Sequence, residues 1–169
     1  EMCIRDSSGP MKAFAVEFYK NGKLLRNKIK NHPRYPYHLL REEMQEFILD
    51  KLQLLIERKL IKGIGENGTE YTVIAQILDL PKEILRLIQK FDFTKKNPKL
   101  IYINTGETMI SLQDSILVTF LNLAGFDILF FVPTGYQSVE NYFAEKLMEE
   151  HQIGEYKYCL LYTSPSPRD

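Results

Sequence analysis

The sequence predicts an α/β fold in which a helical N-terminal half precedes a Rossmann-like βαβα unit with parallel strands. Apolar residues recur at helical spacing between residues 37 and 97. Beyond them, two short apolar runs rich in strand-forming residues, 99–107 and 127–136, flank a helical pattern. Strands joined through a helix pair in parallel, with a right-handed crossover. The chain is thereby divided into a basic segment (8–36), a helical region (37–97) and a βαβα unit (98–158). A short segment lies at each end, 1–7 and 159–169.

The two end segments are interpreted as translated sequencing-adapter DNA. Codons for Glu1–Asp6 and for Cys159–Asp169 can be written as reverse complements over their shared stretch, and the repeat matches a transposon end used to tag sequencing libraries. Residues that derive from cloning are set aside in fold reasoning. We therefore expect the native polypeptide to span roughly residues 8–158 and to be cut at both ends, which makes the predicted domain incomplete.

Composition excludes several kinds of site. With the end segments set aside, no cysteine remains, so a disulfide framework and a cysteine-based zinc site are excluded. The three histidines, His32, His38 and His151, stand far apart in the sequence, and no metal site is expected because metal ligands cluster.

An apolar stretch at 115–132 approaches the length of a membrane span. Asn122, Gly125 and Asp127 interrupt its middle, where a charge is costly in lipid. We expect the stretch to divide at Gly125 into a buried helix and a buried strand, with no membrane contact.

Charge is balanced overall but not along the chain. The sequence has 22 Lys and Arg against 22 Asp and Glu. Residues 12–34 hold Glu17 as their one acidic residue, against these basic ones: Lys12, Lys20, Lys23, Arg26, Lys28, Lys30 and Arg34. A basic segment can bind phosphates or nucleic acid. No glycine-aromatic RNA motif accompanies it, so we expect this segment to pack against the acidic remainder and do not expect nucleic acid as a partner.

Local signals define the N-terminal elements. Alternating residues in 13–18 and the Asn21-Gly22 pair predict a hairpin, with helix as an alternative on its second limb. The helix predicted over 37–62 is the clearest in the chain, with acidic residues early, basic residues late and Gly63 as its left-handed C-terminal cap.

Two further helices are predicted after a glycine-rich turn. Residues 63–70 contain three glycines, but no strand precedes them and no Lys-Ser/Thr pair follows, so a turn between helices is preferred to a phosphate loop. The helices span 70–80 and 81–91, with Asp79 as N-cap of the second and Pro81 in its first turn.

The C-terminal part is predicted as strand, helix, strand, helix. The first helix follows Ser111, which with Asp114 approximates a capping box, and the second spans 138–150. Because both strands are continuously apolar, we expect cover on both faces of their sheet.

Polar residues follow both predicted strands and form the candidate binding site. Ligands of open α/β sheets sit beyond the carboxyl ends of the strands, and a helix N-terminus there favours an anion such as phosphate. The candidate ligand-binding residues are Asn104, Thr105, Gly106, Glu107, Thr134, Gly135, Tyr136 and Glu140. Each also has a structural interpretation, since the glycines can simply make turns, Glu107 can end a helix, and Tyr136 and Glu140 can pack on one helix face.

The strings INTGE (103–107) and PTGYQSVE (133–140), within an apolar pattern over 99–143, resemble the bacterial YceG-like family. EHQIGEYKY (150–158) fits the tail of that family, and the resemblance extends more loosely over 35–97. It implies a cytoplasmic protein encoded in stress and tellurium-resistance clusters, described as a component of a biosynthetic module, with Ter-type stress proteins as partners. Members of the family are much longer than this chain, and no established reaction comes with the resemblance.

Two functions follow as hypotheses. In the first, the βαβα unit binds a phosphorylated sugar or nucleotide for a transfer reaction, by analogy with the nucleotide-sugar half of two-domain glycosyltransferases. Glu107 would orient a hydroxyl, Gly135 and the neighbouring helix N-terminus would hold phosphate, and Tyr136 would stack on a base or sugar. In the second, the chain is a non-catalytic interaction module of a Ter-type stress complex that docks through its helical region, because no nucleophile–base pair is evident.

Overall fold

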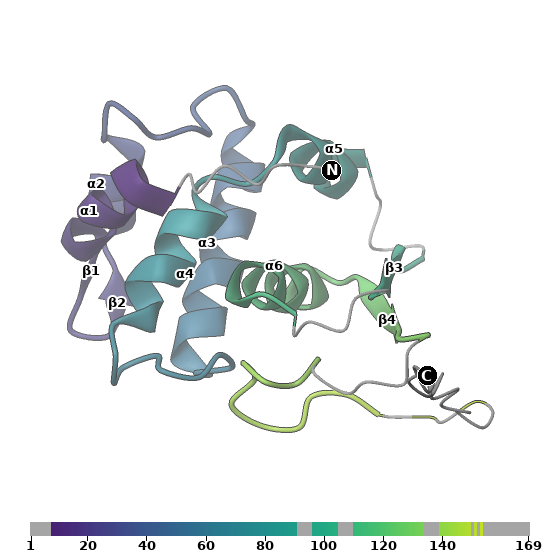
Figure 1. Ribbon diagram of the computed structural model, residues 1–169. Helices are drawn as coiled ribbons and strands as arrows, with labels where there is room; N and C mark the ends of the chain where they lie inside the picture. The colour runs from purple at the N-terminus through teal and green to yellow at the C-terminus, as the bar shows by residue number, and fades with distance from the viewer. Residues whose placement is uncertain are drawn as a thin grey trace, which may run out of the picture.

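The computed structural model of the chain describes residues 8–90, 96–104, 110–133, 139–149, 151 and 153. In chain order the helices and strands are α1 (Ser8–Phe18), β1 (Tyr19–Lys20), β2 (Lys23–Leu24), α2 (Arg26–Lys30), α3 (Glu42–Glu57), α4 (Thr69–Ile77), α5 (Lys82–Lys90), β3 (Lys99–Ile103), α6 (Leu112–Leu123) and β4 (Asp127–Phe131). The fold mixes helix and strand, as the sequence predicts. α6 lies between the helices of the N-terminal half and the sheet formed by β3 and β4 (Figure 1).

A single apolar core joins the helices. α3 lies at its centre and turns one face inward, with buried residues at spacings of three and four: Ile48, Leu49, Leu52, Leu55 and Ile56. α4 and α6 pack against that face, α1 packs in turn on α4, and α6 contributes the fully buried Phe120. Burial of each such side chain stabilises the fold by about 1.5–3 kcal/mol, and most of the buried apolar residues described lie in this helical half.

The prediction of an N-terminal hairpin is confirmed for the turn and is wrong for the first strand. Asn21 and Gly22 have φ values of 52° and 80°, and β1 and β2 pair antiparallel around them, as a type I′ turn requires. Residues 13–18, predicted as strand, belong to α1. Ala15 and Phe18 are both buried, and their spacing of three places them on one face of a helix. The second limb continues as the short helix α2.

α3 is shorter than the helix predicted over 37–62. It begins at Glu42, six residues after Pro36, and ends at Glu57. Lys59 has a φ of 50° and takes the left-handed position that follows the helix, so the prediction that Gly63 is the cap is wrong. The helical signal of residues 58–62 is overridden because Ile61 pairs as an isolated bridge with a distant segment.

Tyr37, in the segment before α3, forms hydrogen bonds with the backbone at the C-terminal end of α4. Its side chain is buried, its hydroxyl donates to the carbonyl of Ile77, and the N–H of Leu80 donates to the same hydroxyl at 3.1 Å. The carbonyl of Ile77 is one of the groups that a helix end leaves without an intrahelical partner. One phenol thus satisfies two backbone groups at the α4–α5 connection.

The glycine-rich stretch forms the predicted turn between helices. Gly63, Gly65 and Gly68 have φ values of 87°, 80° and 75°. A Cβ at Gly63 would lie 2.4 Å from Oγ1 of Thr69, the first residue of α4, so glycine is required there for space as well as for φ. α5 begins at Lys82. The carbonyl of the preceding residue, Pro81, accepts the first helical hydrogen bond, from the N–H of Leu85. Asp79 is therefore not the N-cap.

The long apolar stretch divides as predicted. α6 ends at Leu123, Gly125 has a φ of 106°, and β4 begins at Asp127. Across the part of the chain that the structure describes, no helix combines the length and the apolar character needed to traverse a bilayer.

β3 and β4 pair in parallel, with Lys99 opposite Asp127 and Ile103 opposite Phe131. The predicted strand–helix–strand unit is therefore present, with α6 as its crossover helix. Two parallel strands do not by themselves make a Rossmann sheet, so the Rossmann-like assignment stays a prediction.

Contrary to expectation, one face of this sheet is largely exposed in the part of the chain that the structure describes. Ile101, Ile103, Leu129 and Phe131 are between 50% and 61% exposed. The alternate residues, Leu100 and Ile128 among them, pack against the core beside α6. The strands therefore have one packed and one open face, although both carry apolar side chains.

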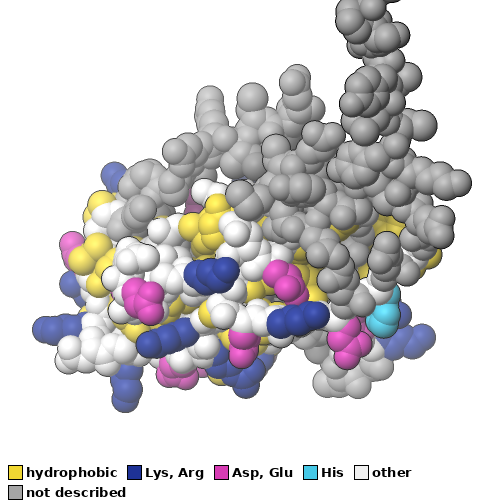
Figure 2. All heavy atoms as spheres, turned by 60° about the horizontal axis from the view of Figure 1, so that its bottom comes forward, with side chains coloured by type: hydrophobic (Ala, Val, Ile, Leu, Met, Phe, Trp, Pro, Cys, Tyr) yellow, Lys and Arg dark blue, Asp and Glu magenta, His cyan; other side chains and the backbone are white. Residues whose placement is uncertain are grey.

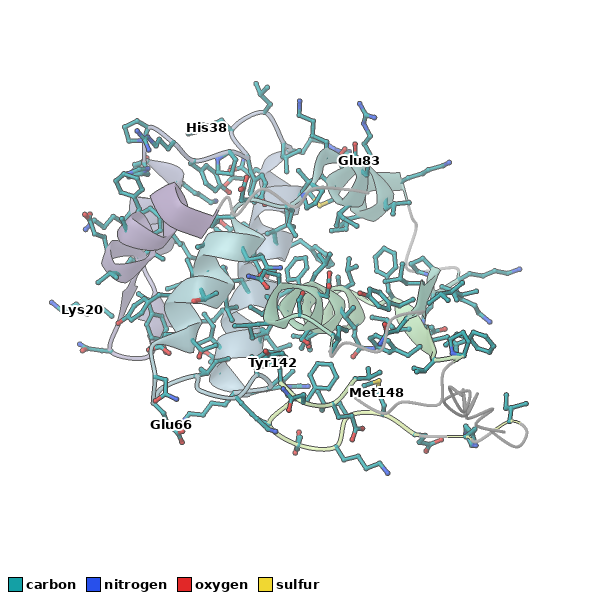
Figure 3. All side chains as sticks on the ribbon, viewed as in Figure 1. Lys20, His38, Glu66, Glu83, Tyr142 and Met148 are labelled. Carbon is teal, nitrogen blue, oxygen red and sulfur yellow. The ribbon has the colours of Figure 1, made fainter. Side chains whose placement is uncertain are left out.

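The helix predicted over 138–150 is absent from residues 139–149. This segment runs irregularly beneath α6, where Tyr142 and Met148 point toward the helices (Figure 3). The N–H of Lys62 donates to the carbonyl of Tyr142 at 2.9 Å, and the N–H of Ala144 donates to the carbonyl of Leu60 at 2.9 Å. Phe143 between them is buried in the core. Helical pairing is lost because these distant backbone bonds and the burial of Phe143 replace it.

The basic segment packs against acidic residues of α3. Arg26 pairs with Glu46 at 2.8 Å and with Asp50 at 2.6 Å, and Lys30 pairs with Glu42 and Glu46. Lys28 adds a pair with Glu17 at 3.1 Å. On the described surface in view in Figure 2, basic and acidic side chains are interspersed. These contacts favour the packing interpretation of the segment.

Candidate functional site

The carboxyl ends of β3 and β4 lie side by side. The N–H of Asn104, the first residue after β3, donates to the carbonyl of Phe131 at the end of β4, over 2.9 Å. Parallel register sets Ile103 opposite the same phenylalanine. Both polar segments predicted to form the site therefore begin at one rim of the sheet, which is where α/β proteins bind ligands.

A carboxylate is held at this rim by two hydroxyls. Asp114 lies in the first turn of α6, and its Oδ2 accepts from Oγ of Ser111 at 2.7 Å and from the phenol of Tyr102 at 3.2 Å. The N–H of Asp114 donates in return to Oγ of Ser111 at 3.0 Å, the N-cap interaction that the sequence predicts. Tyr102 near the end of β3 and Ser111 before the start of α6 thus hold one carboxylate in position.

The environment of Tyr102 keeps its phenol protonated at neutral pH. Burial, followed by the charge of Asp114, raises the pKa of Tyr102, so its phenol remains a donor. The Asp114 carboxylate in the first turn of α6 interacts favourably with the helix dipole. The ring of Tyr102 also lies 5.2 Å from that of Phe130, between centroids. A carboxylate so held can accept a hydrogen bond from a ligand hydroxyl without first being ordered.

The structure describes two of the eight predicted site residues. Asn104 stands at the rim. Glu140 is exposed, and its carbonyl accepts from the N–H of Phe143 at 3.2 Å within the segment bonded to residues 60–62, so it does not stand on a helix. The remaining predicted residues lie outside those described: Thr105, Gly106, Glu107, Thr134, Gly135 and Tyr136.

Sequence reasoning missed Tyr102 and the role of Asp114 at the rim. Asp114 was identified only as the partner of a helix cap, and Tyr102 only as a strand residue. The signal that could have found them is positional, because the last inward-facing residue of a strand and the first turn of its crossover helix meet at the carboxyl end of the sheet.

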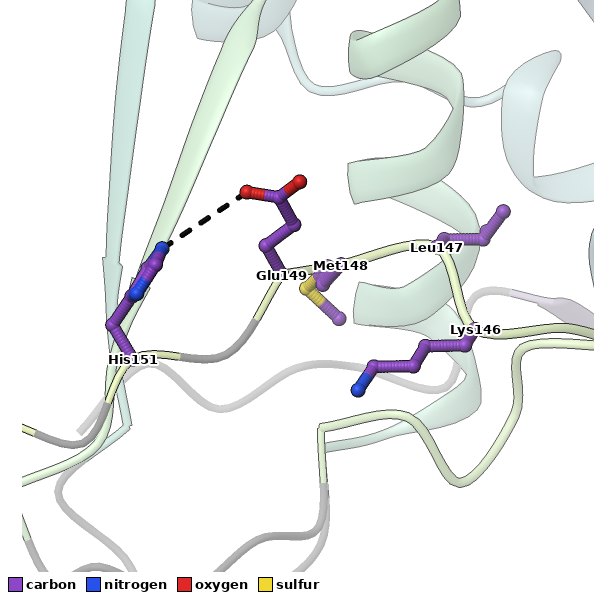
Figure 4. A pocket seen from close by; sticks show the side chains of 5 residues that line it. All are labelled: Lys146, Leu147, Met148, Glu149 and His151. Carbon is purple, nitrogen blue, oxygen red and sulfur yellow. Dashed lines mark ion pairs between the residues drawn. The ribbon is translucent and has the colours of Figure 1, made fainter.

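A surface hollow lies elsewhere, lined by Lys146, Leu147, Met148, Glu149 and His151 (Figure 4). His151 and Glu149 approach to 4.0 Å across it, and both side chains are at least 80% exposed. An exposed pair of this kind contributes little, and of the predicted site residues that the structure describes, neither Asn104 nor Glu140 lines the hollow. The rim of the sheet is therefore the better candidate.

Fold and rim together define an α/β protein with polar residues at the carboxyl ends of two parallel strands. Comparison with known proteins identifies it further: the chain belongs to the YceG domain family, whose model matches residues 4–159. The match includes Ile4–Ser7 and Cys159, so the adapter interpretation of the end segments stays a prediction.

The chain is similar to the uncharacterized protein YceG of Bacillus subtilis (strain 168), with 32% identity over 151 residues. The aligned region covers 87% of this chain and 28% of the relative. The chain therefore corresponds to little more than a quarter of that protein. No solved structure matches the chain.

Proposed function

We propose that the rim of β3 and β4 binds a phosphorylated sugar or nucleotide for a transfer reaction, as part of a bacterial stress-response protein of the tellurium-resistance type. The observation that carries the proposal is the hydrogen bond between Asn104 and Phe131, which brings both polar segments to one edge. The stress-response assignment rests on the family resemblance. If the protein is an enzyme, a transferase resembling a glycosyltransferase fits this ligand class.

The structure modifies the roles of the groups in this proposal. Asp114 is already held by two hydroxyls, so it is suited to accept a hydrogen bond from a sugar hydroxyl, the role proposed for Glu107 from the sequence. Phosphate was expected at the N-terminus of a helix following Tyr136, but residues 139–149 are not helical. Because Asp114 places a negative charge at the N-terminus of α6, we assign phosphate instead to the backbone N–H groups at Gly135, which the sequence already proposed for this role.

Calorimetric titration of the chain with nucleotides and sugar nucleotides tests this proposal. Asp114→Asn should weaken binding about ten-fold, the usual effect of one lost charge-assisted hydrogen bond. Glu83→Gln is the matched control, since Glu83 is an exposed carboxylate on α5 (Figure 3). No binding of any of these ligands, or binding unchanged by Asp114→Asn and by Glu107→Ala with Tyr136→Ala, would remove the proposal.

The alternative is a non-catalytic module that docks Ter-type stress proteins through the helical region. α3 and α4 turn most of their apolar residues toward the core, so among the helices described there α5 presents an exposed apolar side chain, Leu87, at 38% exposure. Leu39, before α3, is the other exposed large apolar side chain described in this region. Leu87→Asp should then abolish capture of purified Ter-type proteins, whereas Lys82→Asp on the same helix should not. Equal capture by both variants would exclude docking through α5.

A further inference from the structure

The open face of the sheet, here called the outer face, consists of Lys99, Ile101, Ile103, Asp127, Leu129 and Phe131. The four apolar members are adjacent because Ile101 pairs with Leu129 and Ile103 with Phe131. All are at least half exposed. The two charged members pair with each other in register at the amino end.

Such a face is unusual in a parallel sheet. Sheets built from parallel strands are covered on both faces, and their strands are apolar throughout for that reason. β3 and β4 approach this composition, since beyond Lys99 and Asp127 at the amino end every residue on either face is aliphatic or aromatic. An antiparallel sheet with one wet face would instead alternate apolar with polar residues. The sequence of these strands is therefore adapted to a second covering layer.

The dimensions of the outer face select the kind of cover. Two strands about 4.8 Å apart make a surface about 10 Å wide, and five residues make it about 17 Å long. One α-helix of about 11 residues has this width and length. Packing of a second copy on the outer face alone would bury far less than the about 800 Å² per partner of a stable interface. A single helix fits the surface, whereas a dimer through it would be too small.

We propose that, in a polypeptide of the length of the Bacillus subtilis relative, an α-helix from outside residues 1–169 packs on the outer face of β3 and β4. That relative has ample chain to supply it, because the region aligned with this chain is 28% of its length. The helix carries an apolar stripe toward the carboxyl half of the strands and a polar end beside Lys99 and Asp127. This inference concerns assembly of the fold and is independent of ligand binding at the rim.

Thiol labelling in two contexts tests the inference. Leu129→Cys is prepared with Cys3 and Cys159 replaced by serine, both in this chain and in a chimera where residues 8–158 replace the aligned segment of the Bacillus subtilis relative. Lys20→Cys is the exposed control, since Lys20 lies on the hairpin away from the sheet (Figure 3). In this chain both thiols should react at similar rates. In the chimera Leu129→Cys should react at least about ten-fold more slowly, because a buried thiol reacts only through local opening, while Lys20→Cys is unchanged.

Equal reactivity of Leu129→Cys in the two contexts would overturn the inference. Protection in this chain alone that grows with protein concentration would overturn it in favour of a second copy. If circular dichroism shows that the chimera is unfolded, the same labelling is carried out on the Bacillus subtilis relative with a cysteine at the position aligned with Leu129. A photo-crosslinker at Leu129 in the longer protein should label residues three or four apart in one segment, and labels that alternate would indicate a strand in place of the helix.

Discussion

Removal of the Tyr37 hydroxyl is the sharpest test of the packing described here. Tyr37 is 1% exposed, and its phenol serves the carbonyl of Ile77 and the N–H of Leu80. Tyr37→Phe preserves the ring and leaves both backbone groups buried without that partner. Each lost partner costs about 1–3 kcal/mol, and loss of the buried hydroxyl itself recovers part of this, so we expect the free energy of unfolding to fall by about 2–4 kcal/mol.

The neighbouring tyrosine provides a matched control. The Tyr35 hydroxyl is buried too, but it makes no hydrogen bond among the residues described. Its ring lies 5.6 Å from that of Tyr37. Tyr35→Phe orphans no other group and removes a buried hydroxyl without a partner, so it should leave the free energy of unfolding unchanged or raise it by about 1 kcal/mol. Urea unfolding followed by circular dichroism at neutral pH measures both. Equal effects of the two variants would refute the assignment of stability to the Tyr37 hydrogen bonds.

The same pair predicts a loss of stability in alkali. Burial raises the pKa of Tyr35 to about 12, and burial raises that of Tyr37 as well. Both phenols ionise more readily in the unfolded chain, with an ordinary pKa of about 10. Their stabilising effect is therefore complete below pH 10 and is lost as pH rises above it. The stability difference between the wild type and Tyr37→Phe should narrow over this range, and a difference that widens would contradict the assignment.

Three further predictions concern local features. Gly63→Ala should lower the urea midpoint more than Gly22→Ala. Both substitutions place alanine at a positive φ, which costs about 1–2 kcal/mol, but a Cβ at Gly63 would also meet a hydroxyl at 2.4 Å, whereas one at Gly22 meets nothing within 4 Å. Equal shifts of the midpoint would exclude the steric contact. Ser111→Ala should cost about 1 kcal/mol by loss of the α6 cap, measured in the same way, and no change would mean that the cap is replaced. The hydrogen bond from Lys30 lowers the pKa of Glu46, so its stabilisation is present above pH 4.5 and is lost as pH falls below it. Unfolding measured between pH 7 and 3 should show a smaller decline in Glu46→Gln than in the wild type.

The parts of the fold predicted correctly depend on short-range signals. Asn21-Gly22 favours a turn with two positive φ values, Ser111 caps the helix that follows it, and Gly125 separates a helix from a strand. In each case the physical cause acts within a few residues, through φ or through one hydrogen bond to a nearby backbone group. The parallel pairing of β3 and β4 was predictable for a related reason, since a helix of twelve residues between two strands permits little else.

The candidate site was predicted as a place and not as a set of contacts. The sequence indicated that polar residues follow two strands, and Asn104 stands at the rim accordingly. It could not indicate that Tyr102 and Asp114 share a hydrogen bond, because this depends on how α6 settles on the sheet. The helix expected beyond Tyr136 as a phosphate holder was wrong for the same kind of reason.

By itself, therefore, the sequence determined the order of most elements, their turns and caps, the parallel unit and the family. Tertiary structure alone decided that residues 13–18 coil into α1, that Phe143 enters the core beside Ile61, and that one apolar face of the sheet remains open. Turns and caps depend on local backbone geometry, so a few neighbouring residues in the sequence are enough to predict them. These other outcomes depend on which apolar side chains can be buried together, and Ile61 and Phe143 lie too far apart in the chain for any local pattern to join them.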